Sequence, residues 1–447
     1  MHNMRLFISG LCLFIFQGLW GQEVSLYSLN EAIDYALINK TEVVNAMADE
    51  QIALAKKNEI RGIGLPQVNA NFDFRNFVER PTNLLPAEFF GGQPGEFVAV
   101  QFGTKYNATA SIEASQIIFS GDYIVALQSS GTYIELSKWA TAKTKNDVAV
   151  EVAKTYYSIL VNQQRIQLLN ESLEQLEKMK NETKAGHEAG FVEQTDLDRI
   201  TVSYNNLEAE KQGLEKMLAL SYAMLKFQMG MELSAPVALR DSLDESALRQ
   251  ASISANAFSA EDRAEIQLLK TQRQLYIQNV KLNRFGYLPT LVAYGSLSAQ
   301  AQRNEFNFFS GEKWYPIGIV GLSLQVPIFD GLQKHYRVQQ ARLEVVKTEN
   351  SLKEASRGLE LEYESAKTSL ENSLDILDRR KENIELARRV FDVSGKKFKA
   401  GTGSSYELIE AETALMEAQA NYYNALYNAM IAWVDYQKAT GTLLEDN

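Results

Sequence analysis

The fold is decided by residues 190–218, GFVEQTDLDRITVSYNNLEAEKQGLEKML, taken together with residues 401–429, GTGSSYELIEAETALMEAQANYYNALYNA. Both stretches begin with a glycine, and they lie 211 residues apart and share an apolar pattern with steps of three and four. The matched positions are Leu197, Ile200, Tyr204, Leu207, Lys211, Leu214 and Leu218 in the first stretch, and Leu408, Ala411, Leu415, Ala418, Tyr422, Ala425 and Ala429 in the second. This pattern predicts helices that pack along an apolar seam. Gly230 and Gly441 share the same offset, which disfavours a chance match and indicates an internal duplication.

The positions of the prolines show how far these helices extend. The chain has 8 prolines, yet residues 95–235 and 328–447 contain none. Proline removes a helical hydrogen bond and clashes with the preceding turn, so both stretches are predicted to form long helices. Residues 122–186 alone would span about 98 Å at about 1.5 Å per residue, roughly three times the hydrocarbon thickness of a bilayer. Such helices must project well beyond a membrane.

The first 21 residues have the features of a secretory signal peptide. Arg5 supplies the positive flank, residues 6–16 form the apolar core, and residues 19–21 form a cleavage site. Cys12, the single cysteine, follows Leu11 inside that core, so we expect it to be removed with the signal. The mature chain would then have no cysteine for a disulfide or a thiolate metal site. No later run of about 18 apolar residues predicts a membrane-spanning helix.

Between the helices the apolar pattern changes from a helical to an alternating period. Apolar and polar residues alternate at 68–75 and 106–115 in the first half and at 320–328 in the second, and less cleanly at 290–300. A half-buried strand of a soluble sheet and a membrane strand beside a wet lumen both give this pattern. The signal peptide, the glycine- and proline-rich loops and the aromatic clusters beside the strands favour the membrane. These aromatic residues are Phe89, Phe90, Phe97, Phe102 and Tyr106 in the first half, and Phe306, Phe308, Phe309, Trp314 and Tyr315 in the second.

The two halves differ in length between landmarks that they share. Leu65-Pro66 recurs at 288–289, an offset of 223, whereas residues 118–121 recur at 328–331, an offset of 210. The first half therefore holds 223 minus 210, or 13, extra residues, which we place in a surface loop. The halves together supply four strands per protomer, and the smallest bacterial single-chain barrels have eight. Because an open sheet edge in lipid leaves backbone groups unsatisfied, several copies must share one barrel.

These features together resemble the TolC family of outer-membrane efflux proteins. The motifs that carry the resemblance are LNEA at 29–32 with Leu65-Pro66, RAEI at 263–266 with Leu288-Pro289, FKAG at 398–401 running into residues 406–411, and ATGTL at 439–443. The resemblance covers the whole mature chain, with residues 22–230 as a first structural repeat, residues 231–262 as a connector and residues 263–447 as a second repeat. It implies a membrane β-barrel continued by a long α-helical barrel, in which a homotrimer closes twelve strands.

The resemblance also implies a function and a set of partners. The protein would be the outer-membrane channel of a tripartite efflux or type I secretion system, a passive exit duct gated at its periplasmic end. Its partners would be a periplasmic adaptor, an inner-membrane pump reached through the adaptor, and outer-membrane lipid. Gly190 and Gly401 would form the adaptor-docking tips, and the cargo stays open among drug, metal, lipid and protein. The expected membrane-interface aromatics are Phe102, Tyr106, Trp314 and Tyr315.

The family narrows its tunnel with an acidic pair just after the second glycine turn, and the matching residues here are Glu407 and Glu410. Three residues apart on a helix, the two carboxylates share one face, and threefold symmetry would make two rings. Phe398 matches an aromatic gate position. The family often has a basic residue two positions after the glycine, where this chain has Gly403, so the latch of the gate is expected to differ.

We expect neither enzymatic activity nor a bound cofactor or metal. After signal removal the histidines are His187 and His335, each isolated, so Cys/His catalysis and common zinc sites are excluded. A net charge of -11 and a pI near 5.1 argue against nucleic-acid binding. The alternative is a soluble periplasmic coiled-coil adaptor or structural protein, which would explain the helical seams but not the strands with a polar face.

Overall fold

The computed structural model describes residues 25–243, 248 and 258–444. The predicted signal peptide lies outside these residues, as does much of the predicted connector. The chain divides into two compact units, and both sequence repeats contribute to each. The strand unit comprises residues 45–144 and 259–361, and the helical unit comprises the described parts of residues 1–44, 145–258 and 362–447. Among the described helices, none combines the length and the apolar character needed to cross a membrane.

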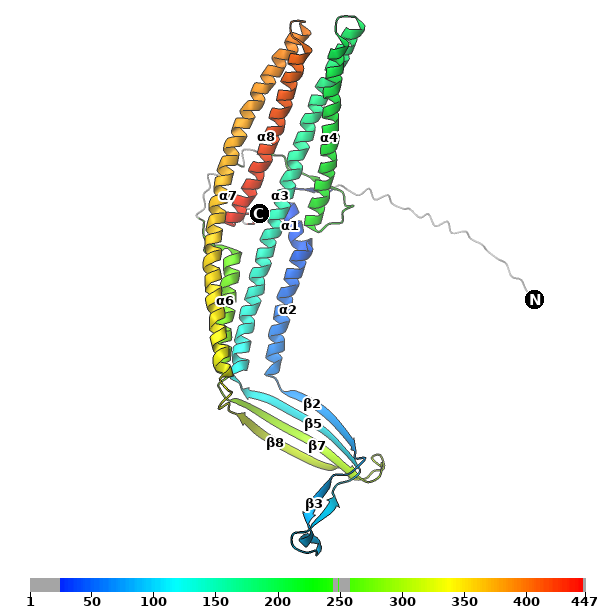
Figure 1. Cartoon of the computed structure of the whole chain (residues 1–447), viewed down its shortest axis with the longest axis vertical. Helices are drawn as coiled ribbons and strands as arrows, with labels where there is room; N and C mark the ends of the chain where they lie inside the picture. The colour runs from blue at the N-terminus through cyan, green and yellow to red at the C-terminus, as the bar shows by residue number, and fades with distance from the viewer. Residues whose placement is uncertain (1–24, 244–247, 249–257, 445–447) are drawn as a thin grey trace, which may run out of the picture. The chain divides into compact units, whose positions relative to one another are not determined.

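The order of elements follows the predicted duplication (Figure 1). The elements are β1 (Ser25–Tyr27), α1 (Leu29–Asn39), α2 (Thr41–Ile63), β2 (Gln67–Asn76), β3 (Thr82–Pro86), the 3-10 helix η1 (Ala87–Phe90), β4 (Phe97–Gln101), β5 (Tyr106–Phe119), α3 (Gly121–Glu188), α4 (Gln194–Met229), β6 (Val237–Leu239), η2 (Ala260–Asp262), α6 (Ala264–Phe285), β7 (Thr290–Arg303), β8 (Tyr315–Gln325), α7 (Gln333–Lys399) and α8 (Ser405–Thr440). The two long hairpins match closely, with 68 and 36 residues in α3 and α4 and 67 and 36 in α7 and α8.

The strand unit contains a four-stranded antiparallel sheet in the order β2-β5-β7-β8, whose strands lie side by side in Figure 1. Its register aligns the alternation of β2, β5 and β7, whereas β8 has Ile317 and Ile319 on the second face. Three apolar rows run across one face, namely Val68–Ala114–Gly295–Val320, Ala70–Ile112–Leu297–Gly318 and Phe72–Ala110–Ala299–Pro316. On the opposite face the first three strands carry polar residues, as in the rows Asn69–Glu113–Ser296 and Asn71–Ser111–Ser298. The sheet therefore has one apolar and one largely polar face.

The last strand ends earlier than its sequence pattern suggests. The alternation predicted a strand through residue 328, whereas β8 ends at Gln325, so Val326 and Ile328 lie beyond it. Pro327 gives the physical reason, because proline has no N–H to donate to a strand ladder. In contrast, β7 is a continuous strand of 14 residues although residues 290–300 alternate imperfectly.

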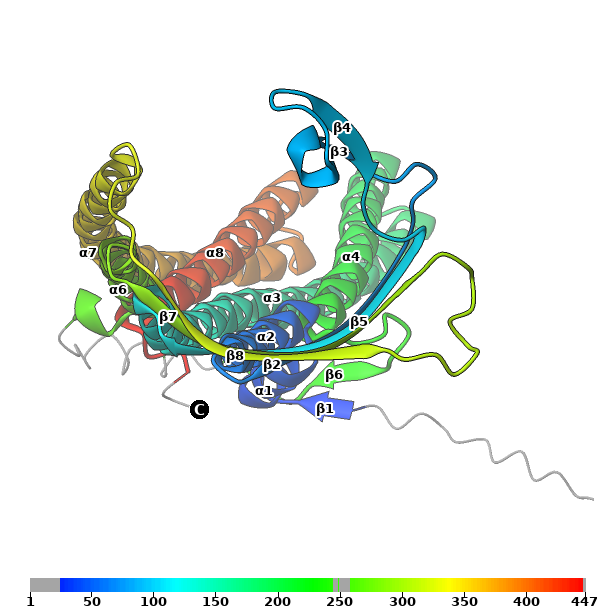
Figure 2. The same ribbon diagram turned by 90° about the horizontal axis from the view of Figure 1, so that it is seen from below.

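The extra residues of the first half lie where the surface loop was expected, but they have a structure of their own. Between β2 and β5, strands β3 and β4 pair antiparallel around η1, and Figure 2 shows this pair set apart from the large sheet. The base is closed by hydrogen bonds from Phe77 N–H to the Lys105 carbonyl at 2.8 Å and from Phe102 N–H to the Pro81 carbonyl at 3.2 Å. We call residues 77–105 the insertion hairpin.

The helices of the strand unit are joined by polar contacts. Gln278 of α6 donates to Thr132 Oγ1 of α3 at 2.8 Å. Arg273 of α6 forms an ion pair with Glu349 of α7 at 3.1 Å. Thr141 Oγ1 of α3 donates to the Ala46 carbonyl of α2 at 3.2 Å. These helices therefore form a connected layer from which the strands continue.

The helical unit is built around an apolar core between α1, α3 and α4. Its largest fully buried side chains include Tyr156, Ile33, Ile159 and Met229. The Tyr156 hydroxyl lies 2.9 Å from both the Tyr27 carbonyl oxygen and Asp241 Oδ2. Burial raises the pKa of Tyr156 above its ordinary value, with Asp241 adding to the shift, so the hydroxyl keeps its proton as a donor.

Part of the predicted connector is held in this unit by a short strand. Strand β6 pairs in parallel with β1, with Ser25 opposite Val237. Leu29 N–H also donates to Asp241 Oδ2 at 2.8 Å, and Arg240 forms an ion pair with Glu31 at 3.0 Å. Residues 237–241 are therefore bound to the start of the described chain.

Candidate functional site

The two turns between the long helices have the same backbone geometry. Gly190 has φ +78° and Gly401 has φ +72°, in the left-handed region that favours glycine. The Gly190 N–H donates to the His187 carbonyl at 2.9 Å, and the Phe191 N–H donates to the Gly186 carbonyl at 2.8 Å. The same pair of bonds closes the second turn, from Gly401 to Phe398 and from Thr402 to Lys397, each at 3.0 Å. Both are Schellman motifs, so the duplicated glycines end α3 and α7 as predicted.

Gly403 fills a crowded position in the second turn. A Cβ atom added there would lie 2.9 Å from the Cβ of Lys397 and 3.2 Å from the Phe398 nitrogen. The Gly403 N–H also donates to the Lys397 carbonyl at 3.1 Å. A side chain at this position would therefore force the end of α7 to shift. This contact gives a physical reason for glycine at a position where the family often has a basic residue.

The predicted gate residues lie where α7 ends and α8 begins. Glu407 and Glu410 are both exposed, on either side of buried Leu408 in the first turns of α8. Ser404 caps this helix, because its Oγ accepts the Glu407 N–H at 3.2 Å. Phe398 is half-buried at the end of α7. The two carboxylates are thus presented to solvent on an ordered helix start, and their role in a gate stays a prediction.

A polar link that sequence reasoning missed joins the starts of α4 and α8. Ser405 is buried and its hydroxyl donates to Asp196 Oδ1. Arg199 lies 3.5 Å from the Ser405 Oγ and 3.8 Å from Asp196. The offset of 211 residues pairs Asp196 with Glu407 and gives no sign of this link; the three-residue spacing of Asp196 and Arg199 was the available signal. The two tips of one protomer are therefore bound to each other.

Glu412 is an acidic residue inside the packed seam of α8. It is 5% exposed and lies between buried Leu408 and Leu415 on the same helix. Burial raises the pKa of Glu412 from 4.5 to about 7. At neutral pH the carboxyl therefore titrates while it is packed against apolar neighbours.

We expect Glu412→Gln to stabilise the protein at high pH. The folded state holds the proton more tightly than the unfolded chain, so the stability associated with Glu412 is present below pH 4.5 and is lost as the pH rises through about 7. The free energy of unfolding of Glu412→Gln should exceed that of the wild type by about 3 kcal/mol at pH 8 and by less than about 1 kcal/mol at pH 5. Thermal unfolding at both pH values measures the difference, with exposed Glu417→Gln as the matched control. Equal gains in stability at both pH values would contradict a raised pKa at Glu412.

A groove lies between α3 and α7 near the tips of the helical unit. It has a volume of about 370 Å³ and is lined by Met179 and Glu182 from α3 and by Phe391 and Gly395 from α7. Lys399 closes one side through an ion pair with Glu182 at 3.5 Å. The groove combines an apolar floor with charged rims.

Aromatic rings pack together where β2 ends, β5 begins and β7 leads into the segment before β8. Phe74 stacks on Tyr106 with ring centroids 6.2 Å apart, and both contact Phe306 at 5.8 and 5.9 Å. Phe308 joins the cluster and contacts Trp314 at 6.3 Å. Two of the four predicted interface aromatics, Tyr106 and Trp314, are therefore brought together, whereas Phe102 and Tyr315 are exposed outside the cluster. Phe74 belongs to the cluster although the sequence indicated it only as a strand residue.

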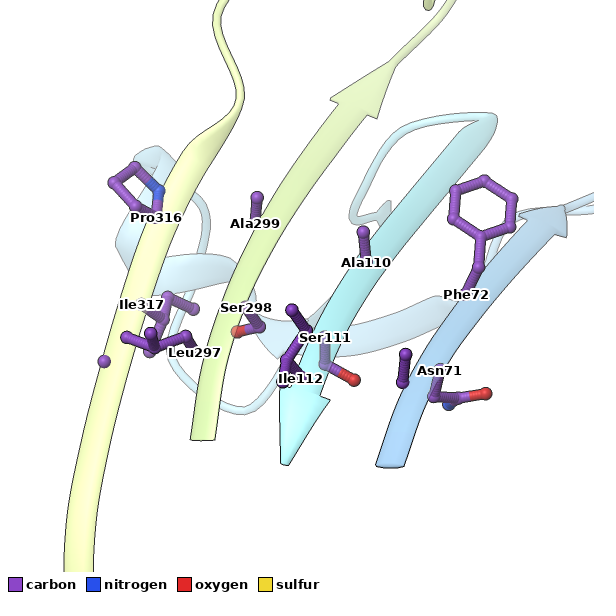
Figure 3. Close-up of a pocket in the computed structure, with 12 residues that line it drawn as sticks. Asn71, Phe72, Ala110, Ser111, Ile112, Leu297, Ser298, Ala299, Pro316 and Ile317 are labelled. Carbon is purple, nitrogen blue, oxygen red and sulfur yellow. The ribbon is translucent and has the colours of Figure 1, made fainter. Parts of the chain in front are cut away.

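The middle of the apolar face of the sheet is hollowed. The hollow of about 780 Å³ is shown in Figure 3, where Ala110 and Ala299 are small side chains between Phe72 on β2 and Pro316 on β8. Phe72, Val320 and Leu322 are exposed on this face. An uncovered apolar face of this kind marks a contact surface for a protein partner or a membrane.

Comparisons with known proteins agree with this geometry. The family described as "Outer membrane efflux protein" matches residues 259–442. Outer membrane protein TolC of Vibrio cholerae is 22% identical over 99% of this chain and 96% of its own length. The pyoverdine export outer membrane protein OpmQ of Pseudomonas aeruginosa is 22% identical, with 94% of this chain and 86% of the relative covered.

Solved channel structures share the fold. The outer membrane protein VceC of Vibrio cholerae gives a TM-score of 0.71 at 14% identity, over 92% of this chain and 96% of that one. The CmeC outer membrane channel of Campylobacter jejuni gives 0.72 at 15% identity, over 98% and 94%. These similarities favour the channel over the coiled-coil adaptor, and the duplicated glycine turns and the two-faced sheet support them. Residues 259–442 thus match the outer-membrane efflux protein family, and nearly the whole chain is similar to TolC proteins.

Proposed function

We propose that the protein is the outer-membrane exit duct of a tripartite efflux or type I secretion system and that it works as a homotrimer. The observation that carries the proposal is the four-stranded sheet with an exposed apolar face and two outer strands, β2 and β8, each paired on one side within the described chain. In lipid, an unpaired strand edge leaves backbone groups without hydrogen bonds. Pairing β2 of one copy with β8 of the next removes every open edge. Three copies then give a closed barrel of twelve strands.

The helical unit also has seams that the single chain leaves uncovered. Exposed apolar residues recur at steps of three and four along α4 and again near the end of α7. They are Met217, Leu220, Met224 and Phe227 on α4, and Leu386, Val390 and Val393 on α7. A seam with this spacing is the packing surface of a coiled coil. Neighbouring copies would cover these seams and extend the barrel as a helical tunnel.

The proposed periplasmic partner is an adaptor that binds the glycine-turn tips and links the duct to an inner-membrane pump. The tips at Gly190 and Gly401 are exposed, as is Phe191 beside the first. The groove between α3 and α7 would offer a second contact surface. Pyoverdine export and alkaline protease secretion occur in the names of two relatives, which supports small-molecule or protein cargo for this chain.

Cell fractionation tests the proposed function. We expect oligomers that dissociate on heating in the outer-membrane fraction, because a closed barrel satisfies its backbone hydrogen bonds within the assembly. Monomer released by osmotic shock would instead support the periplasmic coiled-coil alternative.

The gate prediction is tested by removing its charge. Two rings of carboxylates attract cations and resist close approach without counterions. Glu407→Gln with Glu410→Gln should raise single-channel conductance in planar bilayers and weaken block by divalent cations. The matched control removes two carboxylates from the other tip, Glu193→Gln with Asp198→Asn, both exposed. Unchanged conductance and block in the first variant would dismiss the gate.

A further inference from the structure

The insertion hairpin exposes more apolar surface than a two-stranded hairpin can bury. Leu84, Phe89, Phe90 and Phe97 are all exposed, with Phe89 at 78%. The opposite face of the strand pair is apolar too, since Leu85 lies opposite Val98. An isolated two-stranded hairpin is at best marginally stable in water. The exposed apolar face of this hairpin therefore requires a partner.

The chain connection shows which surface lies next to the hairpin in a closed barrel. The hairpin begins directly after Asn76, the last residue of β2, and β2 is an outer strand of the sheet. In the barrel proposed above, β2 pairs antiparallel with β8 of the next copy. The end of β2 then adjoins the start of that β8 at Tyr315. The loop at residues 304–314, which leads into β8, would lie beside the hairpin.

That loop is a preformed apolar surface. Phe309 is 93% exposed and Phe306 is exposed as well. Buried Arg303 holds the loop from beneath, because its guanidinium donates to the carbonyls of Asn307 and Glu312 and lies 5.1 Å from the Phe308 ring centroid. The two phenylalanines are therefore presented on a fixed backbone.

We propose that the insertion hairpin of one copy packs its exposed apolar face on the loop 304–314 of the next copy, so that three hairpins strap the barrel together at its loop end. This inference rests on the proposed function, since it needs the closed trimer. The partner is a second copy of this chain. Contact between two exposed apolar surfaces removes both from water, which is favourable in proportion to the area buried.

Lipid is the less suitable partner. Glu88 precedes Phe89, and Glu96 precedes Phe97. Insertion of the phenylalanines among acyl chains would bring both carboxylates toward the hydrocarbon, which is costly for a charged group. A protein surface leaves the carboxylates at the solvated rim of the contact. The positions of Glu88 and Glu96 therefore favour the neighbouring copy over lipid as the partner of the hairpin.

Paired cysteines test the strap, because Cys12 of the predicted signal is the single cysteine of the sequence. The strap pair is Phe89→Cys with Phe309→Cys. The barrel pair is Arg75→Cys with Tyr315→Cys, at the adjoining ends of β2 and β8. Both are treated with a short bismaleimide crosslinker in outer membranes and separated on denaturing gels. We expect both pairs to give covalent dimers and trimers.

The outcomes separate the strap from the channel itself. Crosslinking of the barrel pair without the strap pair would overturn the strap and leave the trimer standing, and failure of both would overturn both. Dimers from Phe89→Cys alone would mean that hairpins meet one another, which contradicts the strap. A bimane label at Phe89→Cys that is quenched by nitroxide lipid would assign the hairpin to the membrane and likewise refute it.

Discussion

Phe72→Arg is expected to abolish the assembled channel, whereas Asn71→Arg next to it should leave assembly intact. The two residues are neighbours at the middle of β2 and both are exposed in the single chain. Phe72 belongs to the apolar face of the sheet and Asn71 to the polar face. An arginine on the lipid side of a membrane strand costs about 2–4 kcal/mol near the midplane. Every copy in an assembly would bear this cost.

Asn71→Arg is the matched control because it adds the same side chain one residue away. On the lumen side a charge is solvated, so we expect normal oligomers with a shift of ion selectivity toward anions. Both variants are measured by the amount of heat-sensitive oligomer extracted from the outer membrane, and the control also by reversal potential in bilayers. Equal assembly of the two variants would show that the apolar face does not face lipid.

Gly190→Val is expected to abolish export without affecting assembly. Gly190 has φ +78°, and nothing lies within 4 Å of a Cβ built there, so the substitution acts through the backbone and not through a clash. A side chain in the left-handed region costs about 1–2 kcal/mol, and β-branching makes this worse. We expect the turn to change shape and the adaptor to lose its docking surface.

Asparagine supplies the control at the same position, because it tolerates the left-handed conformation. Gly190→Asn should therefore retain export. Each variant is expressed in a strain that lacks the chain, and its ability to reverse the export defect is compared with its yield of outer-membrane oligomer. If Gly190→Val restores export as well as Gly190→Asn does, the first tip is not a docking surface.

Features with a sequence period could be predicted, and features that depend on long-range contacts could not. The offset of 211 residues identified Gly190 and Gly401, and both end helices in the same motif. Alternation located β2 to within one residue at each end and placed the start of β5 at Tyr106, although β5 continues to Phe119, four residues beyond the predicted end. In contrast, β1 and β6 have three residues each, too few for a period, and they pair across more than 200 residues.

The strands of the insertion hairpin could not be predicted from the sequence for a different reason. Its strands carry apolar residues on both faces, since Leu84 and Leu85 are adjacent, so no alternation marks them. The length difference between the halves was the available signal, and it gave the position but not the structure.

The contacts around the candidate gate likewise could not be predicted where they join distant parts of the sequence. Glu407 and Glu410 were indicated by the resemblance to the TolC family; both are exposed, and their role in a gate stays a prediction. The link between Asp196 and Ser405 joins the two repeats and has no local signature. Glu412 could have been noticed, because it lies four residues after Leu408 and three before Leu415 and so interrupts the apolar seam.

If the four strands lie in lipid, several copies must close one barrel around them, because one copy has too few strands. The number of copies can be measured by light scattering of the purified, detergent-solubilised particle, with the detergent contribution subtracted. We expect a protein mass of three mature chains in a particle that needs detergent to stay in solution. A single chain that remains soluble after the detergent is removed would contradict it.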